Sequence, residues 1–138
     1  MSKPTMTAVV QWQQDNRFLA TSGSGHQVLM DGNKEQGATP MELVLMAAAG
    51  CSSVDVVSIL AKARQQVTGC RCEVKGQRAD AIPAVFTDIH LHFVVTGHGV
   101  ATQHVERAVA LSADKYCSVA KMLEASVQIT HSFAIAEA

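Results

Sequence analysis

The apolar segment at residues 37–60, GATPMELVLMAAAGCSSVDVVSIL, constrains the fold more than any other part of the chain. At its start, Thr39, Pro40 and Glu42 have the spacing of a capping box, with Thr39 as the N-cap and Pro40 at the first helical position. The predicted helix continues to about Gln66 and is apolar on nearly every side as far as Leu60. A helix that is apolar on every side is buried on every side, so it belongs at the centre of the fold.

Segments rich in β-forming residues surround this helix. Predicted strands precede it at residues 5–12, 16–22 and 26–31. After it, apolar and polar residues alternate at 70–75 and 88–95, which predicts two half-buried antiparallel strands. Two predicted helices and a last strand follow at 105–112, 116–125 and 127–135. The order predicts a single α+β domain over residues 1–138, with antiparallel strands around a long buried central helix.

Composition restricts the partners that the chain can have. The 138 residues are 48 % apolar and 17 % charged, as in a folded protein, and the net charge of -1 argues against binding nucleic acid. The most apolar window, residues 43–57, is short for a bilayer and contains Asp55, and no export signal is visible. We therefore expect a cytoplasmic protein without a membrane partner. Because so apolar a helix needs more cover than two small sheets provide, we also expect a homodimer.

The cysteine in the middle of the helix, Cys51, has two interpretations. Free cysteine behaves as a small hydrophobe and is commonly buried, so packing alone explains it. The helix dipole cannot activate its thiol, because Cys51 lies twelve residues after Thr39. A reactive Cys51 would need a nearby cation to hold its thiolate, and an arginine is the best candidate. The preceding Gly50 is unfavourable in a helix, which the close approach of a ligand would explain.

The other cysteines differ in placement. Cys117, in SADKYCSVAKML, lies near the start of the last predicted helix, where its pKa could be lowered or where it could simply fill space. Cys70 and Cys72 are predicted to face the same side of a strand, and their roles stay open. We expect no metal site, because four convergent ligands at a recognised spacing are missing.

Among the five arginines, Arg17 stands out because it follows the turn at Asp15 and Asn16 and begins a strand. A plain surface charge remains an adequate alternative for Arg17. Glu42 likewise has a sufficient role in the capping box itself.

The segments ATPMELVLMAAAGC, which ends in Cys51, and SADKYCSVAKML resemble the osmotically inducible protein C and organic hydroperoxide resistance (OsmC/Ohr) family. The resemblance covers nearly the whole chain, since the leading strands, the long helix and the closing strand are in the family's order. It implies an OsmC-like fold in an intertwined homodimer with two active sites at the interface.

The resemblance also implies an enzyme, a thiol-dependent peroxidase that prefers organic hydroperoxides and serves oxidative-stress defence in bacteria. Carried over by position, Cys51 matches the peroxidatic cysteine, Cys117 the resolving cysteine, and Arg17 the arginine over the reactive sulfur. The family's glutamate follows the proline directly, whereas here Met41 takes that position and Glu42 comes next. Since one residue turns a helical side chain by about 100°, capping is an alternative role for Glu42.

In the implied reaction, Arg17 stabilises the Cys51 thiolate, which attacks the peroxide and becomes a sulfenic acid. Cys117 condenses with it to a disulfide, and an external dithiol of the lipoyl or thioredoxin type reduces this disulfide. No metal or organic cofactor is required. Met46 and Met122 are expected to line an apolar substrate pocket. The alternatives are a non-catalytic dimeric redox sensor, an apolar small-ligand binding protein on the same scaffold, or a structural domain with four packed cysteines.

Overall fold

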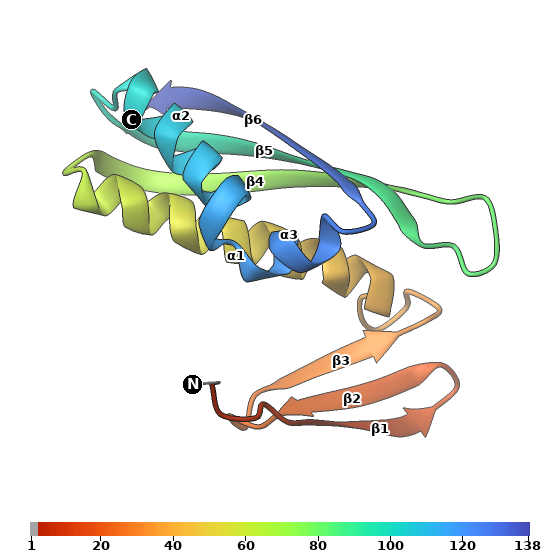
Figure 1. Cartoon of the computed structure of the whole chain (residues 1–138). Helices are drawn as coiled ribbons and strands as arrows, with labels where there is room; N and C mark the ends of the chain where they lie inside the picture. The colour runs from red at the N-terminus through yellow and green to blue at the C-terminus, as the bar shows by residue number, and fades with distance from the viewer. Residues whose placement is uncertain (1–2) are drawn as a thin grey trace. The chain divides into compact units, whose positions relative to one another are not determined.

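The computed structural model describes residues 3–138, in which three strands precede one long helix and three more strands follow it (Figure 1). The chain divides into two compact units, the first ending at Val44 and the second comprising Leu45–Ala138. This mixed content of strands and helices confirms the predicted α+β class. The single domain over residues 1–138 stays a prediction.

The first unit contains an antiparallel sheet in the order β1-β2-β3. Its strands are β1 (Ala8–Gln14), β2 (Arg17–Ser22) and β3 (Gln27–Asp31), so the three strands predicted from the sequence are confirmed with small shifts at their ends. Asp15 turns the chain between β1 and β2 with a φ of 49°, and Gly25 turns it between β2 and β3 with a φ of 90°. The pairing places Arg17, the first residue of β2, opposite Asp31, the last residue of β3.

The long helix α1 (Pro40–Lys62) begins at the predicted capping box. Glu42 N donates to Thr39 Oγ1 at 3.1 Å, and Thr39 N donates to Glu42 Oε1 at 2.9 Å. These reciprocal bonds satisfy two backbone N–H groups that the first turn of a helix leaves without partners. The predicted helix start is therefore confirmed.

Replacing Thr39 by alanine removes the acceptor for the Glu42 N–H. We expect the free energy of unfolding to fall by about 1 kcal/mol, the usual cost of losing an N-cap side chain. Urea denaturation at fixed protein concentration measures this loss. Ser58→Ala, at an exposed interior position of α1, is the control, because alanine is the better helix former there and stability should not fall. An unchanged midpoint in Thr39→Ala would contradict the prediction.

The helix ends at Lys62, four residues before the predicted end at Gln66. Arg64 adopts a left-handed φ of 58°, and Gln65 N donates to Leu60 O while Arg64 N donates to Ala61 O. These two bonds form a Schellman motif, which closes the helix with an arginine where glycine is more usual. Gln66 instead begins the next strand.

The second unit contains a sheet in the order β4-β5-β6. Its strands are β4 (Gln66–Arg78), β5 (Phe86–His98) and β6 (Gln128–Glu137). The antiparallel pairing of β4 with β5 confirms the prediction, but β6 lies parallel to β5. The predicted antiparallel arrangement therefore holds for β4 and β5 but not for β6. The reason is the helical connection after β5, which returns the chain to the other end of the sheet before β6 begins.

That connection consists of α2 (Thr102–Leu111), a five-residue π turn η1 (Ser112–Tyr116) and α3 (Ser118–Leu123). In Figure 1, α1 and α2 lie along one face of the sheet. The core of the second unit lies between them and β5, and its largest buried apolar side chains are Val56, Leu60, Ile89, Leu91, Phe93, Val95, Val105 and Val109. The inward residues of β5 are those that the alternating pattern predicted.

Within a single copy of the chain, the long helix is buried along one side. Its buried residues are Ala48, Ala49, Ser52, Val56 and Leu60. Elsewhere on α1, Val54 is 70 % exposed, Met46 49 % and Val57 42 %. Burial of these side chains by a second copy of the chain stays a prediction. Among residues 3–138, α1 is the one helix that could cross a membrane by length and composition, a test that core helices of soluble proteins also pass.

Candidate thiol site

Two of the four cysteines lie close together in the second unit. Cys51 lies half-buried on α1, and Cys117 is fully buried where η1 meets α3. Cys117 N donates to Ser112 O at 2.9 Å and so closes the π turn. Cys117 Sγ accepts a hydrogen bond from Ala120 N at 3.4 Å, which makes Cys117 the N-cap of α3. The predicted place of Cys117 at the start of the last helix is confirmed.

The surroundings of Cys117 act on its protonation in opposite directions. Burial raises the pKa of the Cys117 thiol above its ordinary value. Hydrogen bonds from the Ser52 hydroxyl, at 3.2 Å, and from Ala120 N oppose this rise in pKa, since both stabilise the thiolate. The neighbouring Cys51 thiol adds to the rise in pKa, so the fold brings together the two cysteines that the sequence selected.

Ser52, whose hydroxyl donates a hydrogen bond to the Cys117 sulfur, was not among the residues predicted from the sequence. Ser52 is 1 % exposed on the inner side of α1. Ser112 Oγ lies 3.3 Å from Ser52 O and 3.1 Å from Asp55 Oδ2, so its hydroxyl ties η1 to α1. The sequence did contain a signal for these contacts. Ser52 and Ser112 lie inside apolar helical segments, and a buried hydroxyl needs a hydrogen-bond partner.

Arg17 and Glu42 lie in the first unit, and each has a partner there. Arg17 Nε donates to Asp31 Oδ2 at 3.4 Å, and Asp31 is completely buried. Glu42 is occupied by the capping box, where the Thr39 N–H lowers the pKa of its carboxyl. The pairing of Asp31 with Arg17 was not predicted from the sequence, although an acidic residue at the end of an apolar strand was a visible signal.

Comparison with known proteins identifies the family. The family model described as OsmC-like protein matches residues 32–132, most of the chain. The chain belongs to the OsmC-like family. It is 53 % identical over 134 residues to Protein YhfA of Escherichia coli strain K12, covering 96 % of this chain and 100 % of that protein. The resemblance stated from the sequence is therefore confirmed.

Solved structures share this OsmC-like fold. A hypothetical protein from Aquifex aeolicus VF5 has a TM-score of 0.89 at 30 % identity, with 99 % of each chain covered. An organic hydroperoxide resistance protein from Legionella pneumophila has a TM-score of 0.72 at 13 % identity, with 97 % of this chain and 99 % of that chain covered. At so low an identity, the second likeness shows the fold alone.

The remaining cysteines of this OsmC-like chain lie on the inner face of β4. Burial raises the pKa of Cys70, and burial with repulsion from Cys70 raises the pKa of Cys72 to about 11. In residues 3–138, no three His, Cys, Asp or Glu side chains gather as a metal site. The imidazole rings of His90 and His92, on β5, each form a hydrogen bond with the Ser132 hydroxyl on the neighbouring strand β6.

The raised pKa of Cys72 predicts slow alkylation. At pH 8 we expect iodoacetamide to modify Cys72 on the order of a hundredfold more slowly than an ordinary cysteine, because far less of it is thiolate. Time-resolved mass spectrometry of Cys72-containing peptides measures the rate. The same protein unfolded in urea is the control, and Cys72 should alkylate there at an ordinary rate. Equal rates in the folded and unfolded protein would contradict the prediction.

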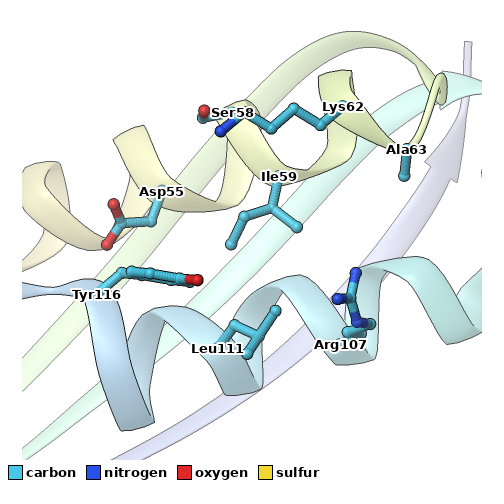
Figure 2. Close-up of a pocket in the computed structure, with 8 residues that line it drawn as sticks. All are labelled: Asp55, Ser58, Ile59, Lys62, Ala63, Arg107, Leu111 and Tyr116. Atoms are coloured by element: carbon cyan, nitrogen blue, oxygen red, sulfur yellow. The ribbon is translucent and has the colours of Figure 1, made fainter.

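A cavity of about 400 Å³ lies between α1 and α2 in the second unit (Figure 2). The residues that line it are Asp55, Ser58, Ile59, Lys62, Ala63, Arg107, Leu111 and Tyr116. Its lining mixes charged and apolar side chains. The part of α1 that lines it begins one helical turn after Cys51. Met46 and Met122, the residues predicted for an apolar pocket, are 49 % and 70 % exposed, and neither lines this cavity. Their role in binding substrate stays a prediction.

Proposed function

We propose that this OsmC-like chain is a cysteine-based peroxidase that reduces organic hydroperoxides, with Cys51 as the peroxidatic and Cys117 as the resolving cysteine. The observation that carries the proposal is the pair of neighbouring thiols, of which Cys51 is half-buried and Cys117 is fully buried. Fold-level likeness to an organic hydroperoxide resistance protein supports the choice of substrate.

In the first step, the Cys51 thiolate attacks the terminal oxygen of the hydroperoxide, and the O–O bond breaks. The electron pair leaves on the alkoxide, which takes a proton and becomes an alcohol, while Cys51 becomes a sulfenic acid. We assign to Arg17 the stabilisation of the thiolate, because its guanidinium is always charged and presents several N–H donors. An arginine is the kind of group that a cysteine far from a helix N-terminus needs for reactivity.

In the second step, Cys117 attacks the Cys51 sulfur, the S–S bond forms, and the hydroxide leaves as water with the Cys117 proton. Cys117 must lose that proton although burial raises its pKa. The hydrogen bond from Ser52 offsets part of this rise in the pKa of Cys117, since it stabilises the developing thiolate. An external dithiol then returns two electrons by exchange, and its two thiols become a disulfide.

Removing the Ser52 hydroxyl should slow this second step. In Ser52→Ala we expect the Cys51 sulfenic acid to persist roughly tenfold longer, the effect of losing about one hydrogen bond to a charged group. Dimedone trapping followed by mass spectrometry measures the lifetime. The rate of the first oxidation is the internal control, because Ser52 contacts Cys117 and not the peroxide. A sulfenic acid that disappears at the original rate would rule out this role for Ser52.

The proposed enzyme works as a homodimer in the cytoplasm. Exposed apolar side chains support a second copy as partner, since Val54 on α1 and Trp12 on β1 are 70 % and 63 % exposed. A reducing compartment suits a pair of free thiols and supplies lipoyl or thioredoxin-type dithiols. Sedimentation equilibrium tests the dimer, and a monomer at micromolar concentration would contradict it.

Stopped-flow oxidation of the reduced protein by cumene hydroperoxide and by hydrogen peroxide tests the function. We expect faster reaction with the organic peroxide, loss of two thiols, and a Cys51–Cys117 disulfide in the mass spectrum. Slow and unselective oxidation would overturn the proposal. It would favour a redox sensor or a small-ligand binding protein, an alternative that the engagement of Glu42 in the helix cap supports.

A further inference from the structure

Ser112 joins three helical segments of the second unit through its backbone and its side chain. Its N–H donates to two carbonyls at the end of α2, and its carbonyl accepts from Cys117 N at 2.9 Å, which closes η1. Its hydroxyl lies 3.1 Å from Asp55 Oδ2 and 3.3 Å from Ser52 O, both on α1. Ser112 is 1 % exposed, so water does not compete for these contacts. One residue therefore connects the turn that carries Cys117 to the helix that carries Cys51.

The turn that Ser112 closes borders an open space. A π turn such as η1 is rare and occurs mostly at functional sites. The cavity of about 400 Å³ lies beside it, with Leu111 and Tyr116 lining one wall and Asp55 on α1 lining another (Figure 2). Because side chains do not fill this space, close packing does not hold η1 against α1 there. The hydrogen bonds of the Ser112 hydroxyl connect the two elements instead.

Among residues 3–138, the side-chain carboxylate of Asp55 accepts a hydrogen bond from Ser112 and forms no ion pair. Asp55 is half-buried, so its charge is partly withdrawn from water. The Ser112 hydroxyl carries one hydrogen, and its shorter contact is with this carboxylate. A hydrogen bond to a charged acceptor is stronger than one between neutral groups. The Asp55 carboxylate therefore fixes the direction of the Ser112 hydroxyl.

We propose that Ser112, held by the Asp55 carboxylate, is a positioning residue that keeps Cys117 in place for its attack on the oxidised Cys51. The inference rests on the proposed peroxidase function, since it concerns the second step of that reaction. Cys117 is held at the end of this set of contacts, because its N–H binds the Ser112 carbonyl. Ser52 has a different role, since its hydroxyl contacts the Cys117 sulfur itself. Neither Ser112 nor Asp55 takes part in the first step.

The first test follows thiol exchange without a peroxide. The Cys51 thiolate attacks oxidised glutathione, which gives a mixed disulfide and releases one glutathione thiolate. Cys117 then attacks the Cys51 sulfur, the S–S bond forms, and the second glutathione leaves as its thiolate. Mass spectrometry of quenched samples measures how fast the mixed disulfide converts. We expect Ser112→Ala to convert it on the order of ten- to a hundredfold more slowly, as misplaced reacting groups do. An equal rate in Ser112→Ala, or a mixed disulfide that persists in the unaltered protein, would overturn the inference.

Variants of Asp55 distinguish positioning from a direct effect of charge. If the Asp55 charge acted on Cys117, Asp55→Ala would remove an anion, favour the Cys117 thiolate and speed the conversion. If Asp55 holds Ser112, Asp55→Ala slows the conversion, and Asp55→Asn, which keeps an oxygen acceptor, restores most of the rate. Asp114→Asn is the matched control, because it removes an exposed charge from η1 itself, and its rate should be unchanged. A faster or unchanged conversion in Asp55→Ala would overturn the inference.

The second test separates this inference from the peroxidase function. With cumene hydroperoxide, Ser112→Ala should oxidise Cys51 at the unaltered rate and then accumulate its sulfenic acid, which dimedone traps. A slow first oxidation in the unaltered protein, together with fast conversion of the glutathione mixed disulfide, would overturn the function while the positioning of Cys117 stands. A fast first oxidation with equal sulfenic acid lifetimes in the two proteins would overturn the positioning instead.

A double-mutant cycle and a second variant separate positioning from folding. Added to Ser112→Ala, Asp55→Ala should slow the conversion little further, because both changes remove the same hydrogen bond. Additive losses would show that Asp55 acts independently of Ser112 and would overturn the inference. If Ser112→Ala, at a buried position, does not fold, the half-buried Asp55→Ala tests the inference alone. A merely structural bond would lower the unfolding midpoint of that variant and leave the conversion rate of the folded protein unchanged.

Discussion

Replacing Cys51 by serine should reduce hydroperoxide turnover at least about a thousandfold, because a serine hydroxyl does not ionise near pH 7 and the reacting sulfur is gone. The measurement is steady-state consumption of cumene hydroperoxide with a dithiol present. Full activity in Cys51→Ser would refute the proposed function outright. No other result for the chain would carry as much information about its chemistry.

Two other cysteine variants serve as controls for this prediction. Cys72→Ser removes a half-buried thiol whose raised pKa keeps it protonated, and turnover should persist. Cys117→Ser should still undergo one rapid oxidation and then accumulate the Cys51 sulfenic acid, since the resolving thiol is missing. If Cys72→Ser were as inactive as Cys51→Ser, Cys72 on β4 would belong to the reactive pair of cysteines. The assignment of Cys117 as the resolving cysteine would then fail.

Replacing Phe93 by alanine should produce the largest loss of stability. Phe93 is 1 % exposed at the middle of β5, and it lies opposite Cys72 on β4 and Phe133 on β6. Truncating a buried phenylalanine removes apolar contacts and leaves a cavity, so we expect the free energy of unfolding to fall by about 3–5 kcal/mol. Urea denaturation at one fixed protein concentration measures the change, because stability depends on concentration if the chain dimerises.

Val94→Ala is the matched control for Phe93→Ala. Val94 is the next residue on β5, but it points to the opposite, half-exposed face of the sheet. Its truncation should cost less than half of what Phe93→Ala costs, since water already reaches that face. Equal losses at the two positions would mean that the outer face of this sheet is covered in solution.

Local features of this fold were predictable from the sequence because neighbouring residues decide them. The capping box at Thr39 and Glu42 requires only the spacing of two side chains along one turn. The alternation in β4 and β5 identified their inward faces, and Cys117 was placed correctly at the start of α3. The end of α1 was predicted less well, because an arginine occupies the left-handed position where glycine is the usual signal.

Only the tertiary structure decided which distant groups meet. The bond from Ser52 to the Cys117 sulfur joins residues of two helices, and no periodicity within either helix specifies it. The pairing of Arg17 with Asp31 depends on the register of β2 against β3, and the parallel direction of β6 depends on the helical connection before it. The residue types of the thiol site could therefore be read from the sequence. Their partners could not, because long-range contacts follow from how whole elements pack rather than from the order of residues within them.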